Sequence, residues 1–145
     1  MPDQRKSRLL LDTHVWIWAV EGEREALSDR AIEEIDEASR EGRILISAIS
    51  VWEVAMLESK GRISLTQPVE DWVMAALRGP GVRLLELSPS IAVQSTRLPG
   101  APPSDPADRI LIAGARTQGA RLVTCDQSLL DYAASGHVQT LSGRR

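Results

Sequence analysis

Short apolar runs alternate with longer helical patterns along the whole of this 145-residue sequence. The runs predict strands at residues 7–12, 43–47, 82–87, 121–126 and 137–141. Helical patterns fill the intervals, and strands separated by helices at this spacing are typical of βαβ units. The sequence therefore predicts an α/β fold around a parallel sheet.

The predicted helices have recognisable ends. They cover residues 13–20, 27–42, 48–61, 68–79, 90–98, 107–119 and 127–136, with a Pro/Gly-rich loop at 99–106. Ser28 is the expected N-cap of the second helix, and Gly42 and Gly61 end the second and third. The apolar residues of helix 13–20 cannot share one stripe, so the helix is either buried all round or faces a second copy in a homodimer. Core burial is the favoured interpretation there, and Trp52 is also assigned to the core.

Length and composition favour one domain at residues 8–142, preceded by a flexible lead-in at residues 1–7. Cys125 is the only cysteine, which excludes an intramolecular disulfide and fits a reducing cytoplasm. No apolar run is long enough for a membrane span, and the first residues lack the apolar core of a secretory signal. The net charge of −3 argues against a broad basic face for nucleic acid, unless bound cations change the local field.

Four acidic residues lie inside apolar segments, unlike most of the 20 Asp and Glu residues. Asp12 and Asp126 each end a predicted strand, Glu53 lies on the helix after the second strand, and Asp108 lies in the first turn of the helix before the fourth. Ligands of open parallel sheets bind outside the carboxyl ends of the strands. We therefore expect the four carboxylates to meet at one edge of the sheet.

Four like charges in one cleft would raise one another's pKa values, and a divalent cation would remove this conflict. Oxygen ligands without a His or Cys cluster favour Mg²⁺ or Mn²⁺ over zinc. One or two such ions can activate water and stabilise a leaving oxygen in phosphate chemistry. The sequence thus points to metal-dependent phosphate chemistry.

Each acid also has a purely structural interpretation at a helix start. Asp12 and Asp126 could simply be N-caps. Asp105 precedes Pro106, a good first helical residue, and is the expected cap of that helix. Asp108 then falls at the third helical position, where a carboxylate complements the helix dipole.

Other residues in these segments also have structural interpretations. Ser50 and Glu53 formally match a capping box, although that would start the helix late. Glu86 and Asp131 are expected to point to solvent, and Cys125 to be a small core residue because no His has the spacing of a catalytic partner.

Four segments, LLLDTHVWIW, ISAISVWEVAMLESKGRI, DPADRILIAGA and ARLVTCDQSL, resemble the PIN-domain ribonucleases in this order. Among these, the resemblance is to the VapC toxins of bacterial VapBC toxin–antitoxin pairs, and it covers residues 8–141. It implies a three-layer α/β/α sandwich with a mostly parallel sheet. It also implies Mg²⁺- or Mn²⁺-dependent endonucleolytic cleavage of RNA that leaves a 5′-phosphate and a 3′-hydroxyl.

The resemblance assigns roles to particular residues. The catalytic and metal-binding acids would be Asp12, Glu53, Asp108 and Asp126, supported by Asp105, Thr124, Arg109 and His14. Thr124 matches a hydroxyl residue that supports metal-bound water or substrate, and Arg109 would contact phosphate or pair with the acids. His14 is otherwise interpreted as packed or hydrogen-bonded, although it lies close enough to Asp12 to touch substrate. The histidine that often precedes the D-P-x-D-R motif of the family is absent here.

The resemblance also implies partners. A cognate antitoxin would wrap the toxin, with the apolar helices around residues 16–18 and 49–57 as contact surfaces, and homodimerisation is usual. Two other functions remain open from the residues: a non-catalytic binding module whose acids only cap helices, and a phosphatase with Asp12 as phosphoryl acceptor. His14 argues against the phosphatase because a second Asp is usual at that position.

Overall fold

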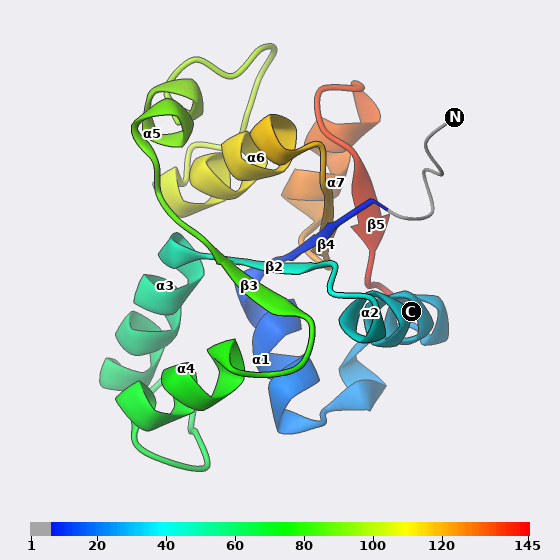
Figure 1. Cartoon of the computed structure of the whole chain (residues 1–145). Helices are drawn as coiled ribbons and strands as arrows, with labels where there is room; N and C mark the ends of the chain where they lie inside the picture. The colour runs from blue at the N-terminus through cyan, green and yellow to red at the C-terminus, as the bar shows by residue number, and fades with distance from the viewer. Residues whose placement is uncertain (1–6) are drawn as a thin grey trace.

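The computed structural model describes residues 7–145, which form helices on both faces of one five-stranded sheet (Figure 1). The strands are β1 (Leu9–Leu11), β2 (Ile44–Ser47), β3 (Val82–Leu85), β4 (Arg121–Thr124) and β5 (Thr140–Ser142). Their order across the sheet is β3-β2-β1-β4-β5, and every neighbouring pair is parallel. The predicted lead-in lies, except for Ser7, outside the described residues.

The sheet is centred on β1, whose three leucines are all buried. Leu10 is paired with Leu45 of β2 on one side and with Leu122 of β4 on the other. A continuous apolar run suits this position because helices cover both faces of a parallel sheet.

The helices begin and end close to the predicted positions. They are α1 (Thr13–Glu21), α2 (Asp29–Arg40), α3 (Ala48–Ser59), α4 (Val69–Leu77), α5 (Pro89–Ser95), α6 (Pro106–Gln118) and α7 (Gln127–Ala134). Ser28 caps α2 by accepting a hydrogen bond from the Ala31 amide, as predicted. A short 3₁₀ helix, η2 (Arg24–Ala26), was not predicted.

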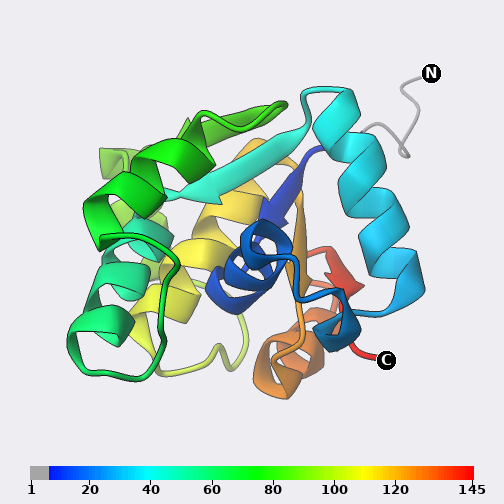
Figure 2. The ribbon, with the colours of Figure 1, turned by 90° about the horizontal axis from the view of Figure 1, so that it is seen from below.

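Two apolar clusters separate the helices into layers. On one face, Leu9 and Leu11 pack with buried residues of α1 to α4; on the other, Leu10 packs with residues of α5, α6 and α7. Figure 1 shows the same division above and below the sheet, and Figure 2 shows α1 lying across the lower face. The predicted three-layer α/β/α sandwich is confirmed, with a wholly parallel sheet.

The two apolar helices of the lower layer have different surfaces. In α1, Val15, Trp16 and Ile17 are buried within the single chain, so core burial is the correct interpretation there. In α3, the assignment of Trp52 to the core is wrong, because its side chain is 58% exposed. Ser50 and Val54, four residues apart, face the core instead, and Trp52 lies midway between them on the opposite side of the helix.

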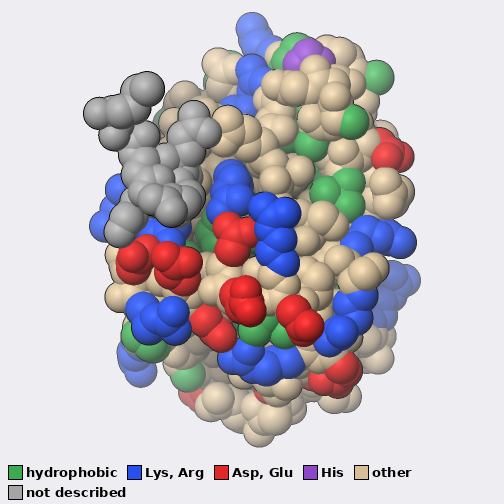
Figure 3. Space-filling model, turned by 90° about the vertical axis from the view of Figure 1, so that its right-hand side faces the viewer, with side chains coloured by type: hydrophobic (Ala, Val, Ile, Leu, Met, Phe, Trp, Pro, Cys, Tyr) green, Lys and Arg blue, Asp and Glu red, His purple; other side chains and the backbone are tan. Residues whose placement is uncertain are grey.

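The surface over α2 and the neighbouring elements carries interspersed acidic and basic side chains (Figure 3). Glu34 of α2 accepts hydrogen bonds from Arg30 and from Arg121 of β4, at 3.1 and 2.5 Å.

Within residues 7–145, no helix is both long enough and apolar enough to cross a bilayer.

Candidate active site

A cleft of about 390 Å³ opens where β1 and β4 end. It is lined by Asp12, Thr13, His14, Val15, Trp18, Glu53, Asp105, Asp108, Cys125 and Asp126. The structure therefore brings together the four acids singled out in the sequence, although they come from four separate segments of the chain.

Asp12 directly follows β1 and is held at both carboxylate oxygens. Oδ1 accepts a hydrogen bond from the Thr13 amide at 2.7 Å, and Oδ2 accepts one from Thr124 Oγ1, also at 2.7 Å. Asp12 is thus the N-cap of α1, as one interpretation predicted, and it also lines the cleft. Burial raises the pKa of Asp12, and the hydrogen bonds from Thr124 and Thr13 offset part of this effect.

Glu53 reaches the cleft from α3. Its Oε1 accepts a hydrogen bond from Thr13 Oγ1 at 2.6 Å. Burial raises the pKa of Glu53, and the charges of Asp12 and Asp105 raise it further. The capping box of Ser50 and Glu53 is not formed, because α3 begins earlier, with Ser47 as its N-cap.

The first turn of α6 supplies two carboxylates. Asp105 is the N-cap and accepts a hydrogen bond from the Asp108 amide at 3.1 Å, with Pro106 as the first helical residue, as predicted. Half-buried Asp108 stands among the other acids. Burial, followed by the charges of Asp105, Asp12, Asp126 and Glu53, raises the pKa of Asp108 from 3.8 to about 7. The cleft is therefore a region of strong negative potential.

Asp126 follows β4 and is linked to Asp12 through Thr124. The Asp126 amide donates to Thr124 Oγ1 at 3.0 Å, and the same hydroxyl donates to Asp12. The carboxylate of Asp126 caps α7 by accepting hydrogen bonds from the amide and hydroxyl of Ser128 at 2.8 and 2.7 Å. Buried Thr124 thus fixes the relative position of two acids.

Of the remaining predicted residues, His14 lines the cleft and Arg109 does not. His14 is exposed, and its ring lies 5.8 Å from that of Trp18. Arg109 donates from Nε to the Pro103 carbonyl at 2.7 Å, and no ion pair joins it to the acids within the described part of the chain. Cys125 is only partly buried: it packs against the core, as expected, and also borders the cleft.

Two hydroxyl residues were missed by the sequence analysis: Thr13, which lines the cleft, and Ser50, which lies behind it. Thr13 and Ser50 are both buried, and their hydroxyl oxygens lie 2.8 Å apart. The position of Thr13 directly after a strand-end aspartate was a usable signal, whereas Ser50 was considered only as a helix cap.

The donor chemistry of the cleft fits a hard divalent cation. Carboxylate oxygens dominate the lining, and such ligands favour Mg²⁺ or Mn²⁺. Within residues 7–145, no three His, Cys, Asp or Glu side chains already stand at the spacing of a finished metal site. Because uncompensated carboxylates repel one another, cation binding would require these side chains to converge.

The sequence and the fold of this chain were compared with those of known proteins. Residues 9–135 match the PIN domain family. The chain is 38% identical over 126 residues to Ribonuclease VapC22 of Mycobacterium tuberculosis (strain ATCC 25618 / H37Rv), a match that covers 86% of this chain and 91% of the relative.

Solved structures share the fold at lower sequence identity. The DNA-bound VapBC structure from Salmonella typhimurium has a TM-score of 0.65 at 17% identity, covering 94% of this chain and 98% of that chain. The FitAcB structure from Neisseria gonorrhoeae has a TM-score of 0.59 at 21% identity, covering 92% and 96%. From the family match, supported by the relative and the shared fold, this chain belongs to the PIN-domain family.

Proposed function

We propose that this chain is the cytoplasmic toxin of a toxin–antitoxin pair and that it cleaves RNA internally with the help of Mg²⁺ or Mn²⁺. The observation that carries the proposal is the convergence of Asp12, Glu53, Asp108 and Asp126 in one cleft. The identity with a ribonuclease supports the reaction type. Structural neighbours described as VapBC and as a toxin–antitoxin complex support the biological setting.

The four acids would hold one or two cations. A bound ion supplies an activated water and stabilises negative charge on the leaving oxygen. The chain itself orients the ligands: Thr124 and the Thr13 amide hold Asp12, and the Thr13 hydroxyl holds Glu53.

Substrate contacts would come from the margins of the same cleft. Asp105 fixes the start of the helix that carries Asp108. We assign Arg109 and His14 to contacts with the RNA phosphates and bases around the scissile bond.

Asp12→Asn tests the proposal, because asparagine retains the helix-capping ability of aspartate and removes the charge. The native chain should bind Mn²⁺ in calorimetry and gain thermal stability, about 2.7 kcal/mol at a hundredfold excess over Kd. The variant should lose RNA cleavage, measured by sequencing RNA ends after induction. Asp131→Asn, at an exposed acid of α7, is the matched control and should cleave normally.

A specific observation favours one alternative, a non-catalytic binding module. Asp12, Asp105 and Asp126 all cap helices, which is the only role that such a module would require of them. Caps do not respond to metal. A native chain that neither binds Mn²⁺ nor cleaves RNA would therefore establish the alternative and refute the nuclease.

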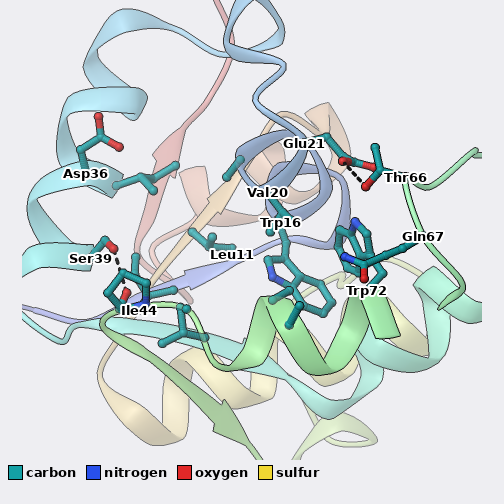
Figure 4. Close-up of a pocket in the computed structure, with 17 residues that line it drawn as sticks. Leu11, Trp16, Val20, Glu21, Asp36, Ser39, Ile44, Thr66, Gln67 and Trp72 are labelled. Carbon is teal, nitrogen blue, oxygen red and sulfur yellow. Dashed lines mark hydrogen bonds between the residues drawn. The ribbon is translucent and has the colours of Figure 1, made fainter. Parts of the chain in front are cut away.

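We further propose that the antitoxin docks over a pocket of about 420 Å³ between α1, α2 and α4 (Figure 4). Trp16 and Trp72 line it with their rings edge to face. Glu21 and Asp36 make the lining acidic. These features suit an apolar side chain on a positively charged segment of the antitoxin. Glu21→Lys should therefore weaken antitoxin binding without reducing Mn²⁺ binding.

A second copy of the chain would cover a different surface. Trp52 of α3 and Val93 of α5 are 58% and 50% exposed, and both helices lie on the left of the molecule in Figure 1. Exposed large apolar side chains mark association surfaces where they form one patch. We propose that they form the homodimer interface.

A further inference from the structure

Glu53 contacts one buried hydroxyl group, and a second buried hydroxyl group contacts the first. Thr13 Oγ1 lies 2.6 Å from Glu53 Oε1 and 2.8 Å from Ser50 Oγ. Thr13 and Ser50 are 2% and 0% exposed, so water cannot readily replace either contact. The three side chains come from α1 and α3, which are distant in the sequence and adjacent in the fold.

The direction of these hydrogen bonds follows from counting protons. Each hydroxyl has one proton to donate, and an ionised carboxylate can only accept. When Glu53 is charged, the Thr13 proton must therefore point to Glu53, and the Ser50 proton is free to point to Thr13 Oγ1. The result is a relay in which Ser50 donates to Thr13 and Thr13 donates to Glu53.

Thr13 also connects two acids of the cleft. Its amide donates to Asp12 Oδ1, and its hydroxyl donates to Glu53 Oε1. A glutamate side chain has several rotatable bonds, and fixing them costs conformational entropy. Because the Thr13 hydroxyl holds one carboxylate oxygen of Glu53, much of this entropy is already lost before any cation binds. The same contact sets the position of Glu53 relative to Asp12.

We propose that Thr13 and Ser50 are positioning residues that keep Glu53 directed into the cleft, from where it can move onto a cation, with Ser50 acting through Thr13. The inference rests on the proposed nuclease function and extends it to residues without charge. Groups that orient metal ligands typically change metal affinity or activity by roughly 10- to 100-fold when they are removed.

Three variants test the relay. Thr13→Val removes the hydroxyl at nearly constant shape, Thr13→Ser keeps it, and Ser50→Ala removes the outer donor. Thr13→Val should weaken Mn²⁺ binding in calorimetry by roughly 10-fold or more. Thr13→Ser should restore most of the affinity. Ser50→Ala should have a smaller effect, and adding it to Thr13→Val should change nothing further, because its path runs through Thr13.

The control for Ser50→Ala is Ser95→Ala, which removes another buried helical hydroxyl, one that donates only within α5. It should leave Mn²⁺ affinity unchanged. Equal Mn²⁺ affinity in Thr13→Val and the native chain would overturn the proposal. Equal losses in Thr13→Val and Thr13→Ser would also overturn it, because shape and not the hydroxyl would then be responsible.

A metal-free measurement separates this proposal from the nuclease function. In a double-mutant cycle of Thr13→Val and Glu53→Ala, urea unfolding in EDTA reports the coupling of the two side chains. Coupling in a chain that fails to bind Mn²⁺ would refute both the nuclease and the role of the pair in metal binding, while confirming the contact. Absence of coupling in a chain that binds Mn²⁺ would refute the relay alone.

Discussion

Replacing Asp108 by Asn should stabilise the metal-free protein at neutral and alkaline pH. The pKa of Asp108 is raised from 3.8 to about 7, by burial and then by the neighbouring carboxylates. Between these two pH values the folded state binds more protons than the unfolded state, so stability falls as pH rises from about 4 to about 7. The asparagine variant lacks this titration and should not show the fall.

The size of the effect follows from the change in pKa. Without any screening by solvent, a rise in the pKa from 3.8 to about 7 corresponds to about 4 kcal/mol of unfolding free energy. Asp108 is only half-buried, and screening by solvent reduces this figure to about 2 kcal/mol. Loss of the favourable interaction between the carboxylate and the start of α6 offsets roughly 0.5 kcal/mol. The variant should thus exceed the native chain in stability by about 1 to 1.5 kcal/mol at pH 8, as the sum of these two effects.

Urea unfolding at low salt in EDTA, repeated from pH 4 to pH 8, measures this difference. The two stability curves should meet near pH 4 and separate as pH rises. Asp131→Asn, at an exposed acid on α7, controls for the general loss of one negative charge. Parallel curves for native and Asp108→Asn across the range would show that neither burial nor the neighbouring carboxylates raise the pKa of Asp108, and would refute the reasoning.

Two further predictions concern the fold and the assembly. Burial raises the pKa of Glu34, but its hydrogen bonds and charge interactions with Arg121 and Arg30 outweigh this and hold the pKa below its ordinary value. The stability that this ion pair contributes is therefore complete above the pKa of Glu34 in the unfolded state and is lost as the pH falls. Glu34→Gln should lower the free energy of unfolding by about 1 kcal/mol at pH 7 and hardly at pH 3, as measured by chemical unfolding. Trp52→Glu should sediment as a monomer at concentrations where the native chain is dimeric, whereas Met74→Glu, on α4, should not; a dimer in both variants would place the interface elsewhere.

The architecture was predictable because local patterns and topology agreed. The leucines of β1 form an apolar run that only a central strand can bury on both faces, and Asp12 directly after them had to lie at the carboxyl edge of the sheet. Asp126 follows the same logic after β4. The approximate meeting of the acids could therefore be inferred without coordinates.

Side-chain partners were less predictable, because they depend on how helices rotate against the sheet. Helix α3 is apolar on nearly all sides, so its sequence did not show that Ser50 faces inward and Trp52 outward. The contact between Thr13 and Glu53 joins residues 40 positions apart, and no local pattern encodes the pairing of two hydroxyls with a carboxylate. Polar contacts of this kind are set by tertiary packing.

The strand order has a consequence for when activity can first arise. The central strand β1 is made first, but its neighbour β4 is made only after α6, and the hydrogen bond from Thr124 to Asp12 spans 112 positions. A nascent polypeptide synthesised only as far as α6 lacks Asp126 and the hydroxyl that steadies Asp12. Translation must therefore have passed β4 and Asp126 before the cleft can assemble with all four acids.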